Sequence, residues 1–225
     1  MTNVDPTDQQ IFWDGVWRQP DSRDFWTQVD PEIASLAATL SPLDRPDVLD
    51  LGCGLGRNAI AFAQAGHRVT AVDLSESAVA SVREQAAEFG LTTIRTRTGR
   101  FSDDLFVPDS FDIVLAVNVL YHALPDDFTQ AICHVSRWLR PGGVFYLTCP
   151  TLEDCLYGQG TEVAPHTFEL EPGHVHFHAT WHHLEELLVG FDLVSRKQRD
   201  HVWEKGGVER VSSRWQILVE KPCAP

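Results

Sequence analysis

The sequence has little positive charge and few cysteines, and each shortage excludes a class of protein. Its 18 lysines and arginines are outnumbered by 32 aspartates and glutamates, which gives a net charge of -14. Because no run of basic residues occurs, binding to nucleic acid or to anionic lipid is disfavoured. The five cysteines form an odd set without a CxxC pair. Neither a disulfide framework nor a thiolate zinc site is therefore indicated.

Long apolar runs are also missing. No apolar segment of about 18 residues occurs, and the N-terminal stretch MTNVDPTDQQ has neither a basic region nor an apolar core. Membrane spans and secretion signals are thereby excluded, and we expect a cytoplasmic protein. The chain has 225 residues, 43% of them hydrophobic, which is enough to bury a substantial core in one domain with an elaborated end.

Strand and helix signals alternate along most of the chain. Apolar runs are followed by segments with apolar residues three and four positions apart, which is typical of helices. The alternation predicts an open, largely parallel sheet with helices on both faces, and the stretch 151–179 is expected to be irregular. Strands are expected at 45–52, 67–75, 92–99, 111–120, 144–150, 191–197 and 213–221, and helices at 56–66, 75–90, 125–143 and from about Thr180.

A glycine-rich turn, DLGCGLGRN, follows the first expected strand. In such a sheet, ligands bind beyond the carboxyl ends of the strands, where this turn lies. A dinucleotide-binding GxGxxG pattern needs a third glycine where this sequence has Arg57. Asp50 precedes the turn, and Asp73 ends the second strand, where one carboxylate can hold a ribose diol. The pattern fits a ligand with a ribose, a positive charge and no phosphate.

These features resemble the class I S-adenosylmethionine-dependent methyltransferases over nearly the whole chain. VLDLGCGLGRNAIAFAQAGHRVTAVDLS is similar to their first two motifs, FDIVLAVNVLYH to the fourth-strand motif, and VSRWLRPGGVFYLT to the entry of the fifth strand. The segments GCGLGRN and GHRVTAVDLS are particularly similar to those of the tellurite-resistance-type small-molecule methyltransferases. The resemblance implies a Rossmann-like, doubly wound, seven-stranded and mostly parallel sheet. Its last strand, Ser212 to Glu220, would run antiparallel between its neighbours.

The resemblance also implies which residues contact S-adenosylmethionine. The backbone of residues 52–54 would approach the methionine moiety, and Asp50 would orient its ammonium group. Asp73 would hold the ribose hydroxyls, and Leu74 would pack on the adenine. The full set of expected cofactor contacts is Trp13, Trp17, Asp50, Gly52, Cys53, Gly54, Gly56, Arg57, Asp73, Leu74, Arg100, Phe101 and Asn118.

The expected adenine contacts depart from the family pattern. Where the family has an acid after the third strand, the segment TGRFSDD puts Arg100. Asp103 or Asp104 would substitute for that acid, or Phe101 would donate its backbone N–H while the adenine amino group contacts water. Asn118, at the end of the fourth strand, matches the position that faces the methyl-transfer site.

Three tryptophans lie close together near the N-terminus. Trp13, Trp17 and Trp26 either anchor a helix against the sheet or form a lid over the active site, where an indole face would attract a sulfonium. We therefore divide the chain into an N-terminal aromatic helical or lid segment, residues 1–40, and a methyltransferase domain, residues 41–225.

A histidine-rich segment, HVHFHATWHH, precedes the last expected helix. His174, His176 and His178 alternate, so on a strand all three would face one side, a spacing compatible with a metal. A solvated polar loop, a substrate or general-base role and a metal site are the alternatives, and no metal is predicted. A similar stretch in related methyltransferases favours His176, with His178 beside it, as a base or orienting donor. Tyr121, from the end of the fourth strand, and His201, from the turn after the sixth, are secondary candidates.

The function that the resemblance implies is transfer of a methyl group from S-adenosylmethionine to a small molecule. In-line displacement needs the donor and acceptor held close together, and a base only when the acceptor carries a proton. The acceptor atom is a sulfur, selenium or tellurium species, an oxygen or a nitrogen. A nicotinamide-dependent oxidoreductase and a noncatalytic cofactor-binding or regulatory protein remain as alternatives.

Overall fold

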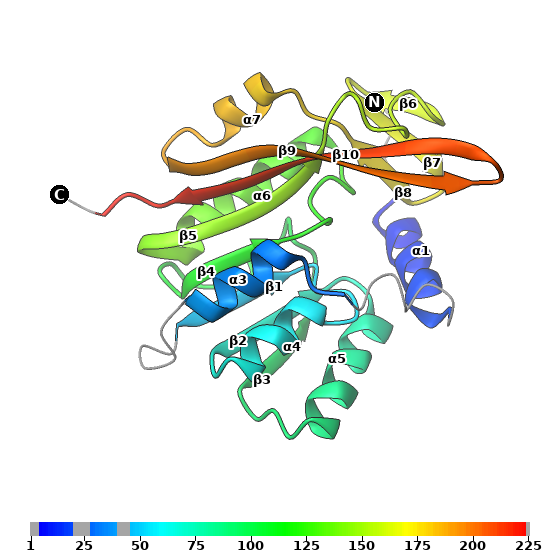
Figure 1. Cartoon of the computed structure of the whole chain (residues 1–225). Helices are drawn as coiled ribbons and strands as arrows, with labels where there is room; N and C mark the ends of the chain where they lie inside the picture. The colour runs from blue at the N-terminus through cyan, green and yellow to red at the C-terminus, as the bar shows by residue number, and fades with distance from the viewer. Residues whose placement is uncertain (1–4, 20–27, 40–45, 224–225) are drawn as a thin grey trace.

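The computed structural model describes residues 5–19, 28–39 and 46–223, and its centre is a seven-stranded sheet (Figure 1). The strands are β1 (Asp47–Leu51), β2 (Arg68–Asp73), β3 (Ile94–Thr98), β4 (Phe111–Ala116), β5 (Leu139–Pro150), β9 (Asp192–Lys205) and β10 (Val208–Glu220). Their order is β3-β2-β1-β4-β5-β10-β9. Strands β1 to β5 pair in parallel, whereas β10 is antiparallel to both of its neighbours. The predicted fold, with its last strand antiparallel between two others, is confirmed.

Helices cover both faces of this sheet. On one face lie α3 (Pro31–Thr39), α4 (Arg57–Gln64) and α5 (Glu76–Glu88), and on the other lie α6 (Pro125–Trp138) and α7 (Trp181–Leu187) (Figure 1). Each face has its own apolar core, one packed against α6 and α7 and the other against α3 and α4. No helix among the described residues is long and apolar enough to cross a membrane.

The central strands are apolar on both sides because helices cover both faces. Val48, Leu49 and Leu51 of β1 have no exposed surface, although successive side chains of a strand point to opposite faces. The same holds for Val114 and Leu115 of β4. Such strands appear in the sequence as continuous apolar runs, and for this reason the centre of the sheet was predictable.

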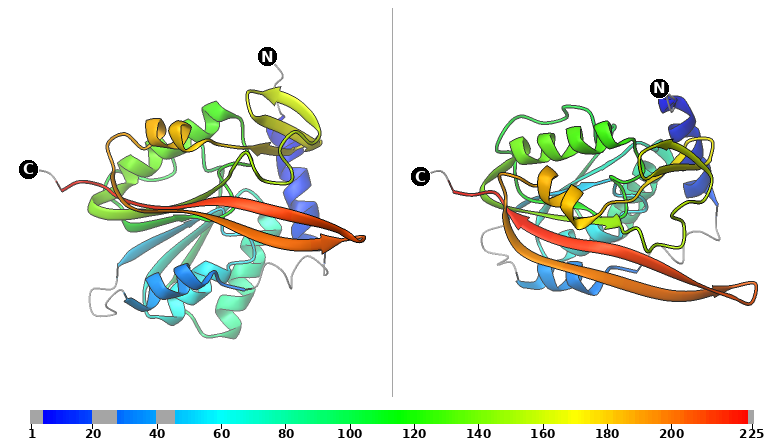
Figure 2. Two further views of the ribbon diagram at one scale, coloured as in Figure 1. Left: turned by 45° about the horizontal axis from the view of Figure 1, so that its top comes forward. Right: turned by 90° about the horizontal axis from the view of Figure 1, so that it is seen from above.

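The stretch 151–179, expected to be irregular, forms a second sheet of three strands. These strands are β6 (Thr161–Ala164), β7 (Thr167–Glu171) and β8 (His174–Phe177), joined as an antiparallel meander. The small sheet lies beside α1 (Pro6–Arg18) (Figure 2). At the turn between β7 and β8 a Cβ atom on Gly173 would lie 2.4 Å from the carbonyl oxygen of Asp8, so α1 contacts this turn closely.

Strands β9 and β10 form a long hairpin that extends past the end of the main sheet (Figure 1). The prediction ended the sixth strand near residue 197 and placed His201 in a turn, which is wrong. His201 lies within β9, opposite Ser212 of β10. In this extension of the hairpin, side chains such as Val202 are exposed, so the segment lacks the apolar pattern of a core strand.

Candidate functional site

The glycine-rich turn after β1 packs tightly against its neighbours. The amides of Gly52 and Cys53 both donate to the carbonyl oxygen of Val72 at 2.8 Å, which fixes the turn to the end of β2. Gly52 has a φ of +72°, and a Cβ atom there would lie 2.0 Å from Cγ2 of Val119. A φ in this range favours glycine, and the space beside the backbone is already filled. Only glycine therefore fits at position 52.

Asp73 holds the same turn from the end of β2. Its Oδ2 accepts a hydrogen bond from the amide of Gly54 at 2.8 Å, and its Oδ1 accepts one from the amide of Ser75 at 2.9 Å. Burial raises the pKa of Asp73 to about 6, although these backbone hydrogen bonds act to lower it. A buried carboxylate of this kind is stabilised by a positively charged or hydrogen-bond-donating ligand.

Asp50 lies behind the turn rather than at its surface. Its Oδ2 accepts a hydrogen bond from the amide of Ala59 at 3.0 Å, in the first turn of α4. The side chain is buried, and burial raises the pKa of Asp50 to about 7. Asp50 lines neither of the two cavities described below, and its carboxylate instead holds the first turn of α4.

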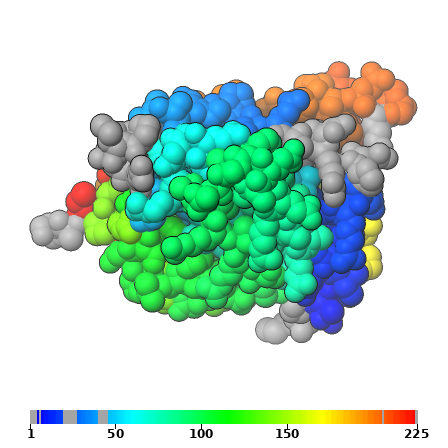
Figure 3. Space-filling model, turned by 90° about the horizontal axis from the view of Figure 1, so that it is seen from below, coloured from blue at the N-terminus to red at the C-terminus, as the bar shows by residue number. Residues whose placement is uncertain are grey.

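Helix α1 is bound to the strand ends by polar contacts at several points. Gln9 donates from Nε2 to the carbonyl oxygen of His122 at 3.0 Å and accepts from Arg100 at 3.2 Å. Asp14 accepts hydrogen bonds from the hydroxyl groups of Ser75 and Ser77 at 2.5 and 2.9 Å. In the space-filling view α1 lies against the side of α5 (Figure 3). Arg100 therefore docks α1, a contact that the sequence did not indicate.

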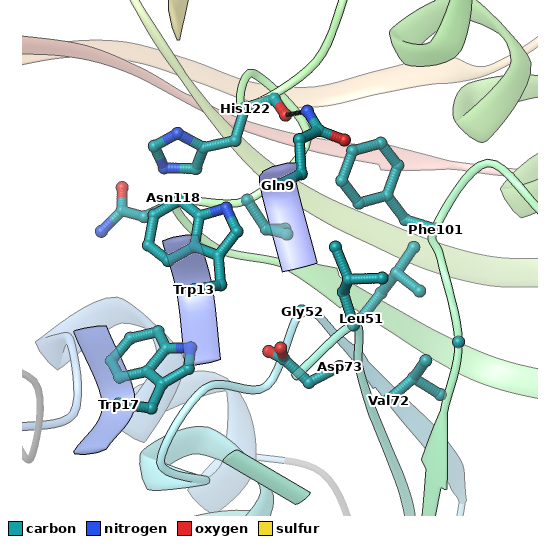
Figure 4. A pocket seen from close by; sticks show the side chains of 13 residues that line it. Gln9, Trp13, Trp17, Leu51, Gly52, Val72, Asp73, Phe101, Asn118 and His122 are labelled. Atoms are coloured by element: carbon teal, nitrogen blue, oxygen red, sulfur yellow. Dashed lines mark hydrogen bonds between the residues drawn. The ribbon is translucent and has the colours of Figure 1, made fainter. Parts of the chain in front are cut away.

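Two tryptophans of α1 cover the glycine-rich turn. The rings of Trp13 and Trp17 stack with centroids 5.9 Å apart. A Cβ atom on Gly54 would lie 3.1 Å from the indole of Trp17. Figure 4 shows both indoles on one side of a cavity and Phe101 on the other, with the carboxylate of Asp73 between them. Trp26, expected to join them, lies outside the described residues.

Two cavities meet beneath α1. The smaller, about 60 Å³, lies at the ends of β1, β2 and β4, and the larger, about 650 Å³, extends toward the small sheet and the β9–β10 hairpin. A volume of several hundred Å³ is typical of a site for a small ligand. The residues that line both are Trp13, Trp17, Gly52, Asn118 and His122. The two cavities are therefore adjoining parts of one site.

The structure brings most of the predicted site residues to these cavities. The smaller is also lined by Asp73, Leu74 and Phe101, and the larger by Cys53, Gly54, Arg57, Tyr121, His176 and His201. The predicted residues that line neither cavity are Asp50, Gly56, Arg100 and His178.

Gly56, Asp103 and Asp104 make contacts outside the two cavities. Gly56 precedes the first residue of α4, and a Cβ atom there would lie 2.7 Å from Cγ2 of Val82 on α5, so this glycine serves helix packing. Asp103 accepts from the amide of Arg100 at 3.3 Å, and Asp104 pairs with Arg137 at the surface. Of the three alternatives weighed for adenine, only Phe101 lines a cavity.

Asn118 has a backbone conformation that is uncommon outside glycine. Its φ is +56°, in the left-handed region that asparagine tolerates better than most residues. The hydroxyl group of Thr148 accepts from the amide of Asn118 at 2.8 Å and donates to its side-chain Oδ1 at 3.0 Å. These two hydrogen bonds hold the Asn118 side chain where both cavities meet.

The far wall of the larger cavity contains a buried ion pair that the sequence did not indicate. Arg214 of β10 contacts Oδ2 of Asp154 at 2.5 Å, and its guanidinium lies 5.3 Å from the ring centre of Tyr121. Burial acts to raise the pKa of Asp154, but the nearby His178 and the charge of Arg214 outweigh it and lower this pKa to about 2. The pair is therefore ionised and its charges compensate each other.

The three alternating histidines do not share one environment. His174 and His176 line the larger cavity, whereas His178 follows the last residue of β8 and its Nε2 lies 3.8 Å from Asp154. The prediction that His178 lies beside His176 on the cavity wall is wrong, because the strand ends between them. The third histidine at the wall is instead His122, which is 52 positions before His174 in the chain.

The chain is similar in sequence and fold to known proteins. A family described as "Methyltransferase domain" matches residues 48–143, which contain the glycine-rich turn, Asp73 and Asn118. A nocamycin O-methyltransferase from Saccharothrix syringae is 35% identical over 125 residues, which cover 53% of this chain and 43% of that protein. The chain spans about half the length of the curated relatives that it matches first.

Two solved structures share the fold. The 1,6-didemethyltoxoflavin N1-methyltransferase of Burkholderia thailandensis, determined with 1,6-didemethyltoxoflavin and S-adenosylhomocysteine, has a TM-score of 0.71 and 24% identity, covering 99% of this chain and 92% of that one. TehB from Haemophilus influenzae has a TM-score of 0.68 and 18% identity, covering 95% of this chain and 67% of that one.

Proposed function

Because this chain belongs to the class I S-adenosylmethionine-dependent methyltransferases, we propose that it methylates a small molecule bound in the larger cavity. The observation that carries the proposal is the junction of the two cavities at Gly52 and Asn118. One cavity leads to Asp73 and the other to a wall of aromatic, histidine and arginine side chains. This arrangement gives separate places for a donor and an acceptor with a shared point between them.

The residues around the smaller cavity fit the ribose and adenine of the donor, and its methionine part would extend past Gly52 along the glycine-rich turn into the larger cavity. Asp73 is a buried carboxylate at the end of β2, placed to accept from ribose hydroxyls, and Leu74 and Phe101 supply apolar surface for adenine. The close-packed backbone of Gly52 would lie against the methionine moiety. When bound, S-adenosylmethionine supplies an electrophilic methyl group on a sulfonium. The chain holds this donor in place, and Asn118 lies where the acceptor meets it.

Helix α1 acts as a cover over this junction in our proposal. Trp13 and Trp17 line both cavities, so a ligand at the junction is enclosed by the two indoles. An indole face attracts a cation most strongly when water is excluded. Trp13 and Trp17 can therefore both anchor α1 against the sheet and cover the active site.

The acceptor wall favours an organic molecule of metabolite size over a bare chalcogen anion. The larger cavity has a volume of about 650 Å³, which leaves room for an organic acceptor beside the methionine part of the donor. Arg214 carries its own counterion, Asp154, and so does not demand an anionic acceptor. Burial and the neighbouring histidines keep the pKa of His176 well below its ordinary value. His176 and Tyr121 therefore orient the acceptor as neutral groups, and a strong base is not required of them.

The experiment that tests this function is an acceptor panel with S-adenosylhomocysteine release as the readout. Heterocyclic, phenolic, amine, thiol and chalcogen-anion acceptors are compared at equal concentration. We expect turnover with an organic ring-containing acceptor, and a panel with no turnover by any acceptor would contradict the proposal. Trp13→Ala is expected to lower kcat/KM at least tenfold, since a positioning contact at the junction is lost. Ile11→Ala, at an exposed site of the same helix, is the control.

Cofactor binding is expected to strengthen as the pH rises from about 5 to about 8. Burial raises the pKa of Asp73 to about 6 and that of Asp50 to about 7 in the ligand-free protein. A positively charged ligand favours ionised carboxylates, so binding near pH 6 should release protons. Calorimetry at pH 6 in two buffers of different ionisation enthalpy measures this release. Equal heats in the two buffers would show that no carboxyl group changes its ionisation on binding.

A further inference from the structure

Three histidine side chains meet at the wall of the larger cavity. His122, His174 and His176 each offer one ring nitrogen, and these three atoms lie within 4.8 Å of one another. The Nε2 atoms of His174 and His176 are 3.0 Å apart. The two residues alternate on β8 and so face the same side, while His122 comes from the loop that follows β4.

The backbone holds the two segments in register. The amide of Phe177 on β8 donates to the carbonyl oxygen of Tyr121 at 2.8 Å, next to His122 in the chain. Gln9 of α1 donates to the carbonyl oxygen of His122 at 3.0 Å. The cluster is therefore built on a strand and on a loop that is hydrogen-bonded to that strand, which favours a constant geometry.

A carbonyl oxygen orients the ring of His122, and a carboxylate lies near that of His174. Nδ1 of His122 lies 3.2 Å from the carbonyl oxygen of Val175, and Nδ1 of His174 lies 3.5 Å from Oε1 of Glu171. When Nδ1 of a neutral imidazole carries the proton, its Nε2 carries a lone pair. Metal-binding histidines usually have such a carbonyl or carboxylate partner on the second nitrogen. The ring of His122 therefore presents Nε2 as the atom that can bind a metal, and Nε2 of His174 faces Nε2 of His176.

Aromatic side chains of α1 shield the rings from water. Phe12 of α1 stacks on His174 with centroids 4.4 Å apart, and Trp13 packs edge-on against His122 at 4.5 Å. Neutral imidazole is the form of histidine that binds metals.

The charges near the cluster do not oppose a cation. Arg214 is the positive group that acts on His122 and His176, and its charge is balanced by Asp154 at 2.5 Å. Glu171 adds a negative charge beside His174. His178, the remaining histidine of the segment, faces Asp154 instead and does not join the set.

We propose that His122, His174 and His176 form a binding site for a late first-row divalent metal ion, with Zn²⁺ as the representative ion. Imidazole ligands suit zinc, copper, iron and nickel rather than magnesium or calcium. A tetrahedral zinc with bonds of about 2.1 Å places its ligand nitrogens about 3.4 Å apart, so small side-chain rotations close the set. Three protein ligands leave one position open, and all three residues line the larger cavity. That position is available to a ligand with a thiolate, phenolate or other Lewis-basic atom.

Metal binding is measured on the full chain without cofactor or acceptor. After dialysis against a chelator, the protein is titrated with Zn²⁺, bound metal is counted by elemental analysis, and Co²⁺ is used for its visible absorption. We expect one metal ion per chain and an absorption spectrum of tetrahedral Co²⁺. Absence of saturable binding would overturn the proposal and leave the contact between His174 and His176 as an ordinary hydrogen bond.

Variants separate this site from adventitious binding. His174→Asn should weaken Zn²⁺ binding at least a hundredfold, and Glu171→Gln, a change at a largely exposed side chain, by roughly tenfold. His182→Asn is the matched control, because His182 is exposed on α7, lies 3.5 Å from Glu186 and lines neither cavity. Equal affinity in all the variants would overturn the proposal, even if one metal ion were bound.

The metal site goes beyond methyl transfer and does not rest on it. Zinc titration uses neither S-adenosylmethionine nor an acceptor, so its outcome is independent of the acceptor panel. Saturable zinc binding with no turnover on any acceptor would support the site and contradict the proposed function. Turnover on an acceptor with no zinc binding would support the proposed function and contradict the metal site.

Discussion

Gly52→Ala is expected to abolish S-adenosylmethionine binding and to lower the melting temperature by about 6 to 12 °C. A Cβ atom at this position would lie 2.0 Å from Cγ2 and 2.5 Å from Cβ of Val119, and the residue has a φ of +72°. Backbone strain of roughly 1 kcal/mol and the displacement of Val119 together cost about 3 kcal/mol. Since Gly52 lines both cavities, the same displacement distorts the site.

Gly90→Ala is the matched control for this change. Gly90, after α5, has a φ of +64°, but nothing lies within 4 Å of a Cβ atom there. It should cost only the backbone strain, about 1 kcal/mol, and leave cofactor affinity unchanged. Thermal unfolding and calorimetric titration of both variants compare the two effects. If both variants lost the same stability and still bound the cofactor, the side chain of Val119 would be able to move aside at little cost. The close packing at Gly52 would then not constrain the turn.

Asp73→Ala is expected to weaken S-adenosylmethionine binding about a hundredfold. Two charge-assisted hydrogen bonds to ribose hydroxyls would be lost, at about 1.5 kcal/mol each. The variant also leaves the amides of Gly54 and Ser75 without their acceptor. The turn itself is then less well held, so part of the loss comes from its position. The measurement is the Kd from calorimetric titration at pH 8, where Asp73 of the wild type is ionised.

Two further variants separate these contributions. Asp73→Asn keeps an acceptor oxygen but removes the charge, and we expect an intermediate loss of affinity. Asp104→Ala removes an exposed acid that pairs with Arg137 away from the cavities, and it should bind the cofactor as the wild type does. Wild-type affinity in Asp73→Ala would contradict the placement of the ribose at this carboxylate.

The parallel half of the fold was predictable because its signals are local. Strand β1 is an apolar run buried on both faces. The glycines that follow it have positive φ values, a conformation that favours glycine, so the turn is visible in the sequence itself. Asp73 is the last residue of β2. Because ligands bind beyond the carboxyl ends of the strands, Asp73 was expected to lie beside the glycine-rich turn. The family resemblance added the antiparallel position of β10, which no local pattern indicates.

The acceptor side was not predictable in the same way. His122 lies in the loop after β4, where the strand-end rule could have singled it out, but its nearness to His174 depends on the pairing of the β8 segment with this loop. The small sheet has short strands with irregular register, so its alternation is weak in the sequence. The Asp154–Arg214 pair likewise joins residues 60 positions apart. Such contacts exist only in the folded chain.

The most direct test of the central claim is calorimetric titration of the purified chain with S-adenosylmethionine and, separately, with a nicotinamide dinucleotide. The dinucleotide-binding pattern needs a third glycine, for close helix–strand packing, where this sequence has Arg57, while the carboxylate of Asp73 suits a ribose on a cationic ligand. We predict saturable binding of one S-adenosylmethionine per chain and no saturable binding of the dinucleotide. Tight binding of the dinucleotide without binding of S-adenosylmethionine would contradict the account.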